Sequence, residues 1–156
     1  MDTGTSECMN DVRLSPTLDT PIFQDILVQA QYWHDPLDET TYRARSRFLA
    51  DINNERRPRS AEYRDNLLNL ENFVMVKFTE DTVVDPKETE WFEFYAPGQA
   101  QTILPLKESP IYKEDWIGLK ELDESGRLRF LSSEGNHLRF TKEFLREEIV
   151  KPFLLN

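Results

Sequence analysis

Two short apolar segments, each followed by a loop with an ionisable side chain, constrain the fold of this chain more than any other feature. Residues 73–78 (FVMVKF) are apolar at nearly every position, and residues 128–131 (LRFL) form a second, shorter segment of this kind. Apolar runs of this length favour strands that are covered on both faces of a parallel sheet. Asp85 follows the first segment and His137 follows the second. Ligands bind outside the carboxyl ends of such strands, so both side chains are predicted at one edge of a sheet.

The chain order, acid first and histidine second, is that of the last two triad members in an α/β-hydrolase. In such a triad the imidazole accepts the nucleophile's proton, and the carboxylate fixes the imidazole's tautomer. The third member has no candidate, because the sequence contains no G-x-S-x-G and its five glycines do not have that spacing. On the residues alone, the alternative is that Asp85 begins an Asp-Pro turn and His137 is an ordinary loop residue.

Helical periodicity and capping residues place helices around the two strands. Ser60 and Thr141 are suitable N-caps, and apolar side chains recur at helical spacing in five segments. The predicted helices cover residues 21–33, 39–52, 60–70, 111–122 and 142–149. A parallel pair of strands needs further strands and helices to cover its faces and edges. We therefore expect the chain to be part of a larger α/β fold whose missing strands lie N-terminal.

Composition excludes several classes of partner. A net charge of −10 argues against nucleic acid and against adsorption to anionic lipid. With two histidines and one cysteine, a dedicated zinc site is not expected. No apolar run is long enough for a transmembrane segment, and residues 1–8 have neither the basic nor the apolar region of a signal peptide. Taken literally, the sequence predicts a protein that stays in the cytosol.

Eight sequence motifs, in order and without large gaps, carry a family resemblance. They are residues 29–36 (QAQYWHDP), 48–53 (FLADIN), 72–78 (NFVMVKF), 84–86 (VDP), 90–95 (EWFEFY), 98–100 (GQA), 117–120 (IGLK) and 134–137 (EGNH). Together they closely resemble the palmitoyl-protein thioesterases, a family of lysosomal α/β-hydrolases. The resemblance runs from about residue 20 to the C-terminus.

The resemblance implies an activity. Members of this family remove long-chain fatty acyl groups from cysteine thioesters of S-palmitoylated proteins, using Ser, Asp and His and no metal or organic cofactor. By resemblance Asp85 matches the triad acid and His137 the triad base, and the location is the lysosome. The nucleophile segment, the oxyanion-hole amides and the signal peptide have no counterpart in the chain. The nucleophile is therefore expected outside this sequence, as in a C-terminal half of the enzyme.

The resemblance also implies a domain organisation. Residues 1–19 are expected to be an unmatched polar segment, and residues 20–72 to be the helical insertion that forms much of the fatty acyl site as a lid. Residues 73–156 are expected to hold the last two core strands and the C-terminal helix of a partial α/β-hydrolase fold. In the insertion Trp33, Phe48, Leu49 and Ile52 are candidates for the acyl groove, or equally for plain helix packing.

Two functions remain open at this point. The first is a palmitoyl-protein thioesterase, of which this chain supplies the acid, the base and the acyl-binding insertion. The second is a catalytically inactive truncated product that acts as an acyl-binding or partner-binding fragment.

Overall fold

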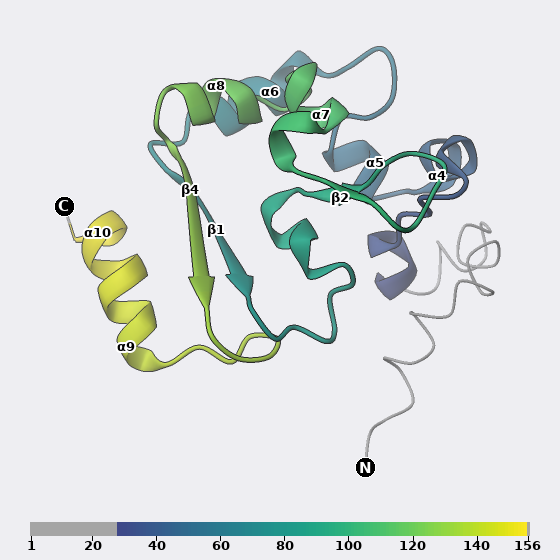
Figure 1. Ribbon diagram of the computed structural model, residues 1–156. Helices are drawn as coiled ribbons and strands as arrows, with labels where there is room; N and C mark the ends of the chain where they lie inside the picture. Colours follow the sequence, from purple (N-terminus) through teal and green to yellow (C-terminus); the bar gives the residue numbers. More distant parts are fainter. Residues whose placement is uncertain (1–27, 156) are drawn as a thin grey trace.

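A two-stranded parallel sheet forms the centre of the computed structural model, which describes residues 28–155 (Figure 1). Strand β1 (Phe73–Phe78) pairs with strand β4 (Leu128–Ser133) from one end to the other, so that Phe73 lies opposite Leu128 and Phe78 opposite Ser133. Both predicted strands are thus present and run parallel. The chain has the mixed α/β character that the sequence predicts.

The sheet is covered less completely than predicted. On β1 Met75 and Phe78 are buried, whereas on β4 the Phe130 side chain is 39% exposed. Met75 and Leu128 join one core cluster, which gathers mainly residues from the connection between the strands: Leu106, Tyr112, Trp116, Ile117, Leu119 and Leu122. Phe130 lies on the same face of β4 as Leu128, because alternate residues of a strand share a face, so in the described part of the chain the core covers this face only in part.

Four helical elements precede the sheet: the 3₁₀ helix η2 (Val28–Tyr32), α4 (Glu39–Arg45), α5 (Leu49–Ile52) and α6 (Ala61–Leu68). Helix α6 begins after Ser60, whose hydroxyl accepts a hydrogen bond from the Tyr63 amide at 3.3 Å, as its cap position predicts. The predicted segment 1–19 lies outside the described residues, and so does the first part of the helix predicted at 21–33.

The helix predicted at 39–52 is wrong as one continuous element, because the chain breaks at Ser46. The buried Ser46 ends α4, and its hydroxyl accepts a hydrogen bond from the Ala50 amide at 3.3 Å. Arg56 donates to the carbonyls of Arg43 and Ser46. A serine side chain and an arginine thus satisfy backbone groups that a continuous helix would have paired internally.

The connection between the strands contains the 3₁₀ helix η3 (Lys87–Trp91), the antiparallel pair β2 (Phe94–Tyr95) and β3 (Ile103–Leu104), the 3₁₀ helix η4 (Leu106–Glu108), α7 (Pro110–Lys113) and α8 (Leu119–Glu124). The helix predicted at 111–122 is split into α7 and α8. Asp115 and Gly118 have left-handed backbone conformations, with φ of 51° and 90°, which an α-helix cannot contain.

The C-terminal helical segment comprises α9 (Lys142–Phe144), the π-helical turn η5 (Leu145–Val150) and α10 (Lys151–Leu154). Thr141 caps it by accepting a hydrogen bond from the Phe144 amide at 3.0 Å, as predicted. This segment lies at one end of the molecule and α4 and α5 lie at the other (Figure 1). None of the helices within residues 28–155 has the length and apolar character needed to cross a membrane.

Candidate active site

A buried carboxylate and a histidine meet just beyond the carboxyl ends of the two strands. The Nδ1 atom of His137 lies 2.7 Å from Oδ2 of Asp81. The Asp81 side chain has no solvent exposure, whereas the His137 side chain is 33% exposed. The other Asp81 oxygen, Oδ1, accepts hydrogen bonds from the amides of Val83 (2.7 Å) and Val84 (2.9 Å). The carboxylate is therefore held from two sides and presents its remaining oxygen to the imidazole.

The sequence prediction that His137 pairs with Asp85 is wrong in geometry. Asp85 is an exposed residue that precedes Pro86, and among residues 28–155 it forms no hydrogen bond or ion pair with His137. Asp85 and His137 nevertheless border the same cleft. The acid that contacts the histidine is Asp81.

The strand register explains why Asp81 is the partner. Phe78 and Ser133 lie opposite each other at the ends of β1 and β4, and the pairing continues through Thr79, whose amide donates to the Ser133 carbonyl at 3.0 Å. Asp81 is three residues beyond its strand and His137 is four residues beyond its own. Asp85 is seven residues beyond β1, after the chain has already turned away through the Asp81 loop.

The two loops that carry the acid and the base are bonded to each other. The Asn136 side chain accepts a hydrogen bond from the Thr82 amide at 3.0 Å and exchanges one with the Thr82 hydroxyl. Gly135 has a φ of 111°, and a Cβ atom there would lie 3.1 Å from the Arg139 carbonyl. The loop after β4 thus requires glycine at this position.

The electrostatics of the pair favour an ionised acid. Burial acts to raise the pKa of Asp81, but the hydrogen bonds from the Val84 amide, from His137 and from the Val83 amide outweigh it and lower the pKa below the usual value of 3.8. An ionised carboxylate accepts a hydrogen bond from Nδ1–H of His137. The lone pair of Nε2 then remains available to accept a proton, which is the arrangement of a general base.

A second carboxyl group, that of Glu90, lies beside this pair. Burial raises the pKa of Glu90, while the hydrogen bond from the Phe78 amide (2.7 Å) opposes that rise and the charge of Asp81 adds to it. Three side chains, those of Asp81, Glu90 and His137, each offer one potential ligand atom, and these atoms lie within 4.8 Å of one another. A group this close could hold a metal ion. Since Asp81 and His137 are hydrogen-bonded to each other, we interpret the group as an acid–base cluster, and the absence of a metal remains a prediction.

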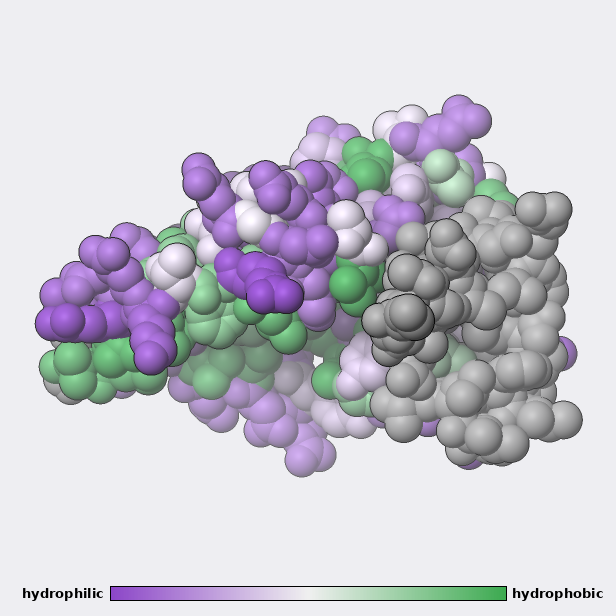
Figure 2. Space-filling model, turned by 90° about the horizontal axis from the view of Figure 1, so that it is seen from below, coloured by the Kyte–Doolittle hydropathy of each residue, from purple (hydrophilic) through white to green (hydrophobic). Residues whose placement is uncertain are grey.

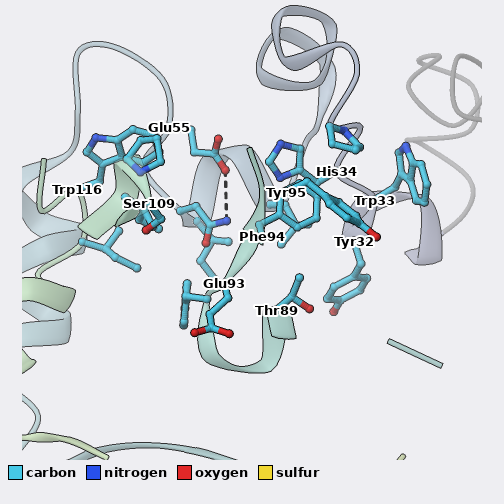
Figure 3. Close-up of a pocket in the computed structure, with 18 of the residues that line it drawn as sticks. Tyr32, Trp33, His34, Glu55, Thr89, Glu93, Phe94, Tyr95, Ser109 and Trp116 are labelled. Carbon is cyan, nitrogen blue, oxygen red and sulfur yellow. Dashed lines mark hydrogen bonds between the residues drawn. The ribbon is translucent and has the colours of Figure 1, made fainter. Parts of the chain in front are cut away.

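A large cleft of about 1480 Å³ adjoins His137. Ligand sites commonly measure about 300–1,000 Å³, so this space can accept a long ligand. Aromatic and aliphatic side chains line most of it; Figure 3 shows Tyr32, Trp33 and His34 on one side and Trp116 and Ser109 on the other. On the face seen in Figure 2, exposed hydrophobic residues form a band that is flanked by hydrophilic residues.

All four predicted acyl-groove residues border this cleft: Trp33, Phe48, Leu49 and Ile52. Ile52 is 48% exposed, and Phe48 and Leu49 are half-buried. The same cleft includes His137, which lies more than eighty positions away in sequence. The helical segment and the acid–base pair therefore share one cavity.

An aromatic sandwich anchors the helical segment to the cleft wall. The His34 ring stacks between Tyr42 and Phe94, with ring centroids 3.7 Å and 4.2 Å away. Its Nε2 atom lies 2.9 Å from a Glu39 carboxylate oxygen. No sequence pattern predicts this contact, because stacking on a residue 60 positions away leaves no local signal.

Sequence reasoning missed Asp81 and Glu90. The signal for Asp81 was its closeness to the end of β1, in the polar run Thr79-Glu80-Asp81 that directly follows the apolar residues. Glu90 had no such signal, since its role depends on η3 folding back along β1 so that its carboxylate reaches the Phe78 amide.

Comparison with known proteins shows which family the chain resembles. A profile of the family described as palmitoyl protein thioesterase matches residues 3–137. The match begins upstream of residue 20, where the resemblance is expected to start. Palmitoyl-protein thioesterase 1 of Caenorhabditis elegans is 49% identical over 135 residues, which are 86% of this chain and 45% of that protein.

Two further relatives show the same relation. Palmitoyl-protein thioesterase 3 of Dictyostelium discoideum is 41% identical over 133 residues, or 85% of this chain and 45% of that protein. Lysosomal thioesterase PPT2 of Homo sapiens is 36% identical over 98 residues, or 62% of this chain and 32% of that protein. The chain thus spans about half the length, or less, of the curated relatives it matches. Since the family profile covers most of its residues, the chain belongs to the palmitoyl protein thioesterase family.

Proposed function

We propose that this chain supplies the acid–base pair and much of the acyl-binding site of a thioesterase that hydrolyses long-chain fatty acyl thioesters on S-acylated cysteines of proteins. The observation that carries the proposal is the hydrogen bond of 2.7 Å between His137 and the buried Asp81, at the wall of a large and mostly apolar cleft. Membership of the thioesterase family supports the choice of substrate.

In the proposed reaction a serine hydroxyl attacks the thioester carbonyl carbon while Nε2 of His137 takes the hydroxyl proton. The carbon–sulfur bond then breaks, and the cysteine sulfur leaves as a thiolate that takes up the proton. In the second half, His137 removes a proton from water, which attacks the carbonyl carbon of the acyl-serine ester. The ester carbon–oxygen bond breaks, the fatty acid is released, and His137 returns the proton to the serine oxygen. Asp81 holds the imidazole in one tautomer and stabilises the imidazolium that forms in both halves.

The nucleophile is assigned to a part of the enzyme beyond the described residues. Within residues 28–155 no hydroxyl or thiol is hydrogen-bonded to Nε2 of His137. We propose that β1 and β4 are the last two core strands of a partial α/β-hydrolase fold, within a core part at residues 73–156. Residues 20–72 are proposed as the acyl-binding insertion. The name of the human relative, a lysosomal thioesterase, supports the lysosome as the proposed location.

A chimera tests this proposal directly. The matched segment of this chain replaces its counterpart in the Caenorhabditis elegans relative, and hydrolysis of a palmitoyl thioester is measured. We expect activity in the chimera, and a fall of about 10³-fold or more in kcat when His137→Ala or Asp81→Asn is introduced.

Asp85→Asn is the matched control, because Asp85 borders the same cleft without contacting His137. It should leave kcat within about threefold of the unsubstituted chimera. A chimera without thioesterase activity would contradict the proposed function. A large loss with Asp85→Asn and none with Asp81→Asn would instead contradict the assignment of the acid.

A further inference from the structure

Glu90 lies behind the Asp81–His137 pair and has no part in the chemistry described above. It belongs to η3, the 3₁₀ helix that follows the acid loop, and is partly buried. Its Oε2 atom accepts a hydrogen bond of 2.7 Å from the amide of Phe78, the last residue of β1. Its carboxylate also falls within the group of atoms from Asp81 and His137 that lie within 4.8 Å of one another. Glu90 therefore connects the end of a core strand to the acid–base pair.

Two carboxyl groups this close do not both ionise without cost, so the distribution of hydrogen bonds decides which one holds a proton. Asp81 accepts two amide hydrogen bonds and the contact from His137, all of which favour its ionised form. Glu90 accepts one amide hydrogen bond, from Phe78. Any proton shared by the two carboxyls is therefore held preferentially by Glu90.

Within the described residues, the lysines on the neighbouring elements do not reverse this preference. The ionisable groups whose charges act on Glu90 are Asp81 and His137. On β1 the ammonium group of Lys77 lies 3.6 Å from the centroid of the Trp91 ring, and on η3 the ammonium group of Lys87 donates to the Thr79 carbonyl at 2.6 Å. Neither lysine forms an ion pair with Glu90.

We propose that Glu90 is a positioning residue for the acid–base pair. Its protonated carboxyl donates a hydrogen bond to the Asp81 carboxylate, while its other oxygen holds the Phe78 amide. These two hydrogen bonds hold the Asp81 carboxylate in position to contact Nδ1 of His137. Loss of the Glu90 proton removes this donor and adds a second negative charge beside Asp81, so the pair loses its alignment as pH rises. The catalytic consequence rests on the proposed function, whereas the contact itself does not.

Glu90→Gln and Glu90→Ala separate this role from simple packing. Glutamine keeps the size, one acceptor oxygen and a donor, but it cannot ionise; alanine removes both hydrogen bonds. In the chimera we expect Glu90→Ala to lower kcat/KM by about 10–100-fold, since a small misplacement of the base is sufficient for such a loss. Glu90→Gln should retain kcat/KM within about threefold in the acidic range, and its activity should persist to higher pH than that of the unsubstituted enzyme.

Glu88→Gln is the control, because Glu88 lies on the same 3₁₀ helix and is not among the three groups that approach one another. It should leave both kcat/KM and the pH profile unchanged. An effect of Glu88→Gln equal to that of Glu90→Gln would show that any change of charge on η3 has the same consequence, and would contradict the proposal.

A readout that needs no catalysis is the NMR titration of the His137 imidazole in the full chain. The sequence contains two histidines, so the His137 signals are assigned by their loss in His137→Ala. We expect the His137 shift to report a second titration step from Glu90, which disappears in Glu90→Gln and remains in Glu88→Gln.

The role of Glu90 and the proposed function can fail independently. An unchanged rate with Glu90→Ala, or a loss with Glu90→Gln as large as that with Glu90→Ala, would overturn the protonated-donor role. A single-step titration of His137 in the unsubstituted chain would overturn it as well. An inactive unsubstituted chimera would contradict the proposed function alone, since the titration still decides the role of Glu90.

Discussion

The Asp81 carboxylate combines complete burial with three hydrogen-bond contacts, so its ionisation is coupled to folding. These contacts are the amides of Val83 and Val84 and Nδ1 of His137. In the unfolded chain the same carboxyl is solvated and titrates near 3.8. Because the folded pKa lies below that value, ionised Asp81 stabilises the folded state above the unfolded pKa. This contribution is lost as pH falls through the folded pKa.

The pH dependence of unfolding checks this coupling. Urea unfolding between about pH 3 and pH 6 should show a free energy of unfolding that falls steeply on the acidic side. In Asp81→Asn this part of the curve should flatten, whereas Asp85→Asn should retain it. Equal slopes in Asp81→Asn and the unsubstituted chain would show that other carboxylates cause the acidic loss.

Glu90 contributes to folding stability with a pH dependence opposite to that of Asp81. Its folded pKa is raised by burial and by the Asp81 charge, so its contribution to stability is present at low pH and is lost as pH rises through the folded pKa. The two carboxyls together define an acidic range in which the site is most stable.

At the residue scale, His137 was predictable and its acid was not. His137 follows a recognisable strand and a glycine, and the chain order matches that of a hydrolase. The choice between Asp81 and Asp85 depended on where the chain turns after β1. The turn is made by side-chain hydrogen bonds of Asp81 itself, and these are not visible in a hydrophobic pattern.

At the scale of elements, positions with left-handed backbone decide where helices end. Gly118 lies between α7 and α8 with a φ of 90°, and a Cβ atom there would lie 2.9 Å from the Leu68 side chain on α6. Gly126 follows α8 with a φ of 69°, but a Cβ atom there would meet open space. The first glycine is required by both conformation and packing, and the second by conformation alone.

Alanine at these two glycines separates the two causes. Gly126→Ala should lower the free energy of unfolding by about 1–2 kcal/mol, the cost of a left-handed conformation for a residue with Cβ. Gly118→Ala should cost about 1–3 kcal/mol more, because α6 must also move away from the new methyl group. Equal losses in chemical denaturation would contradict the contact between Gly118 and α6.

The strands and the capped helices were predictable because their signals are local. Ser60 and Thr141 lie at their expected caps, and the apolar run at residues 73–78 became β1 over its whole length. The helix predicted at 39–52 failed because Ser46 is held by Arg56, ten positions away. Contacts between distant side chains overrode periodicity at that point.

At the scale of the whole molecule, the cleft joins the helical segment to the core. Its lining includes the predicted groove residues, His34 and Phe94 of the aromatic sandwich, and His137. Each CH₂ group that leaves water contributes about 0.8 kcal/mol, so under the proposed function we expect a cleft of this size to prefer long acyl chains.

Binding of non-hydrolysable acyl thioether ligands of increasing length tests this preference. Affinity should rise with chain length from eight to sixteen carbons (roughly 0.8 kcal/mol for each additional buried CH₂). Phe48→Ala should weaken the binding of the longest ligand, whereas Leu154→Ala, which lies on the C-terminal helical segment outside the cleft, should not. Affinity that is independent of length would contradict an acyl groove.

The parallel pairing of β1 with β4 also affects the order and the rate of folding. Register partners such as Phe73 and Leu128 are separated by the whole connection that builds the core, and contacts of such long sequence separation form slowly. Asp81 and His137 come together only once that pairing is complete. A nascent or partly folded chain therefore has no assembled Asp81–His137 pair, and we expect this pair to form among the last events of folding.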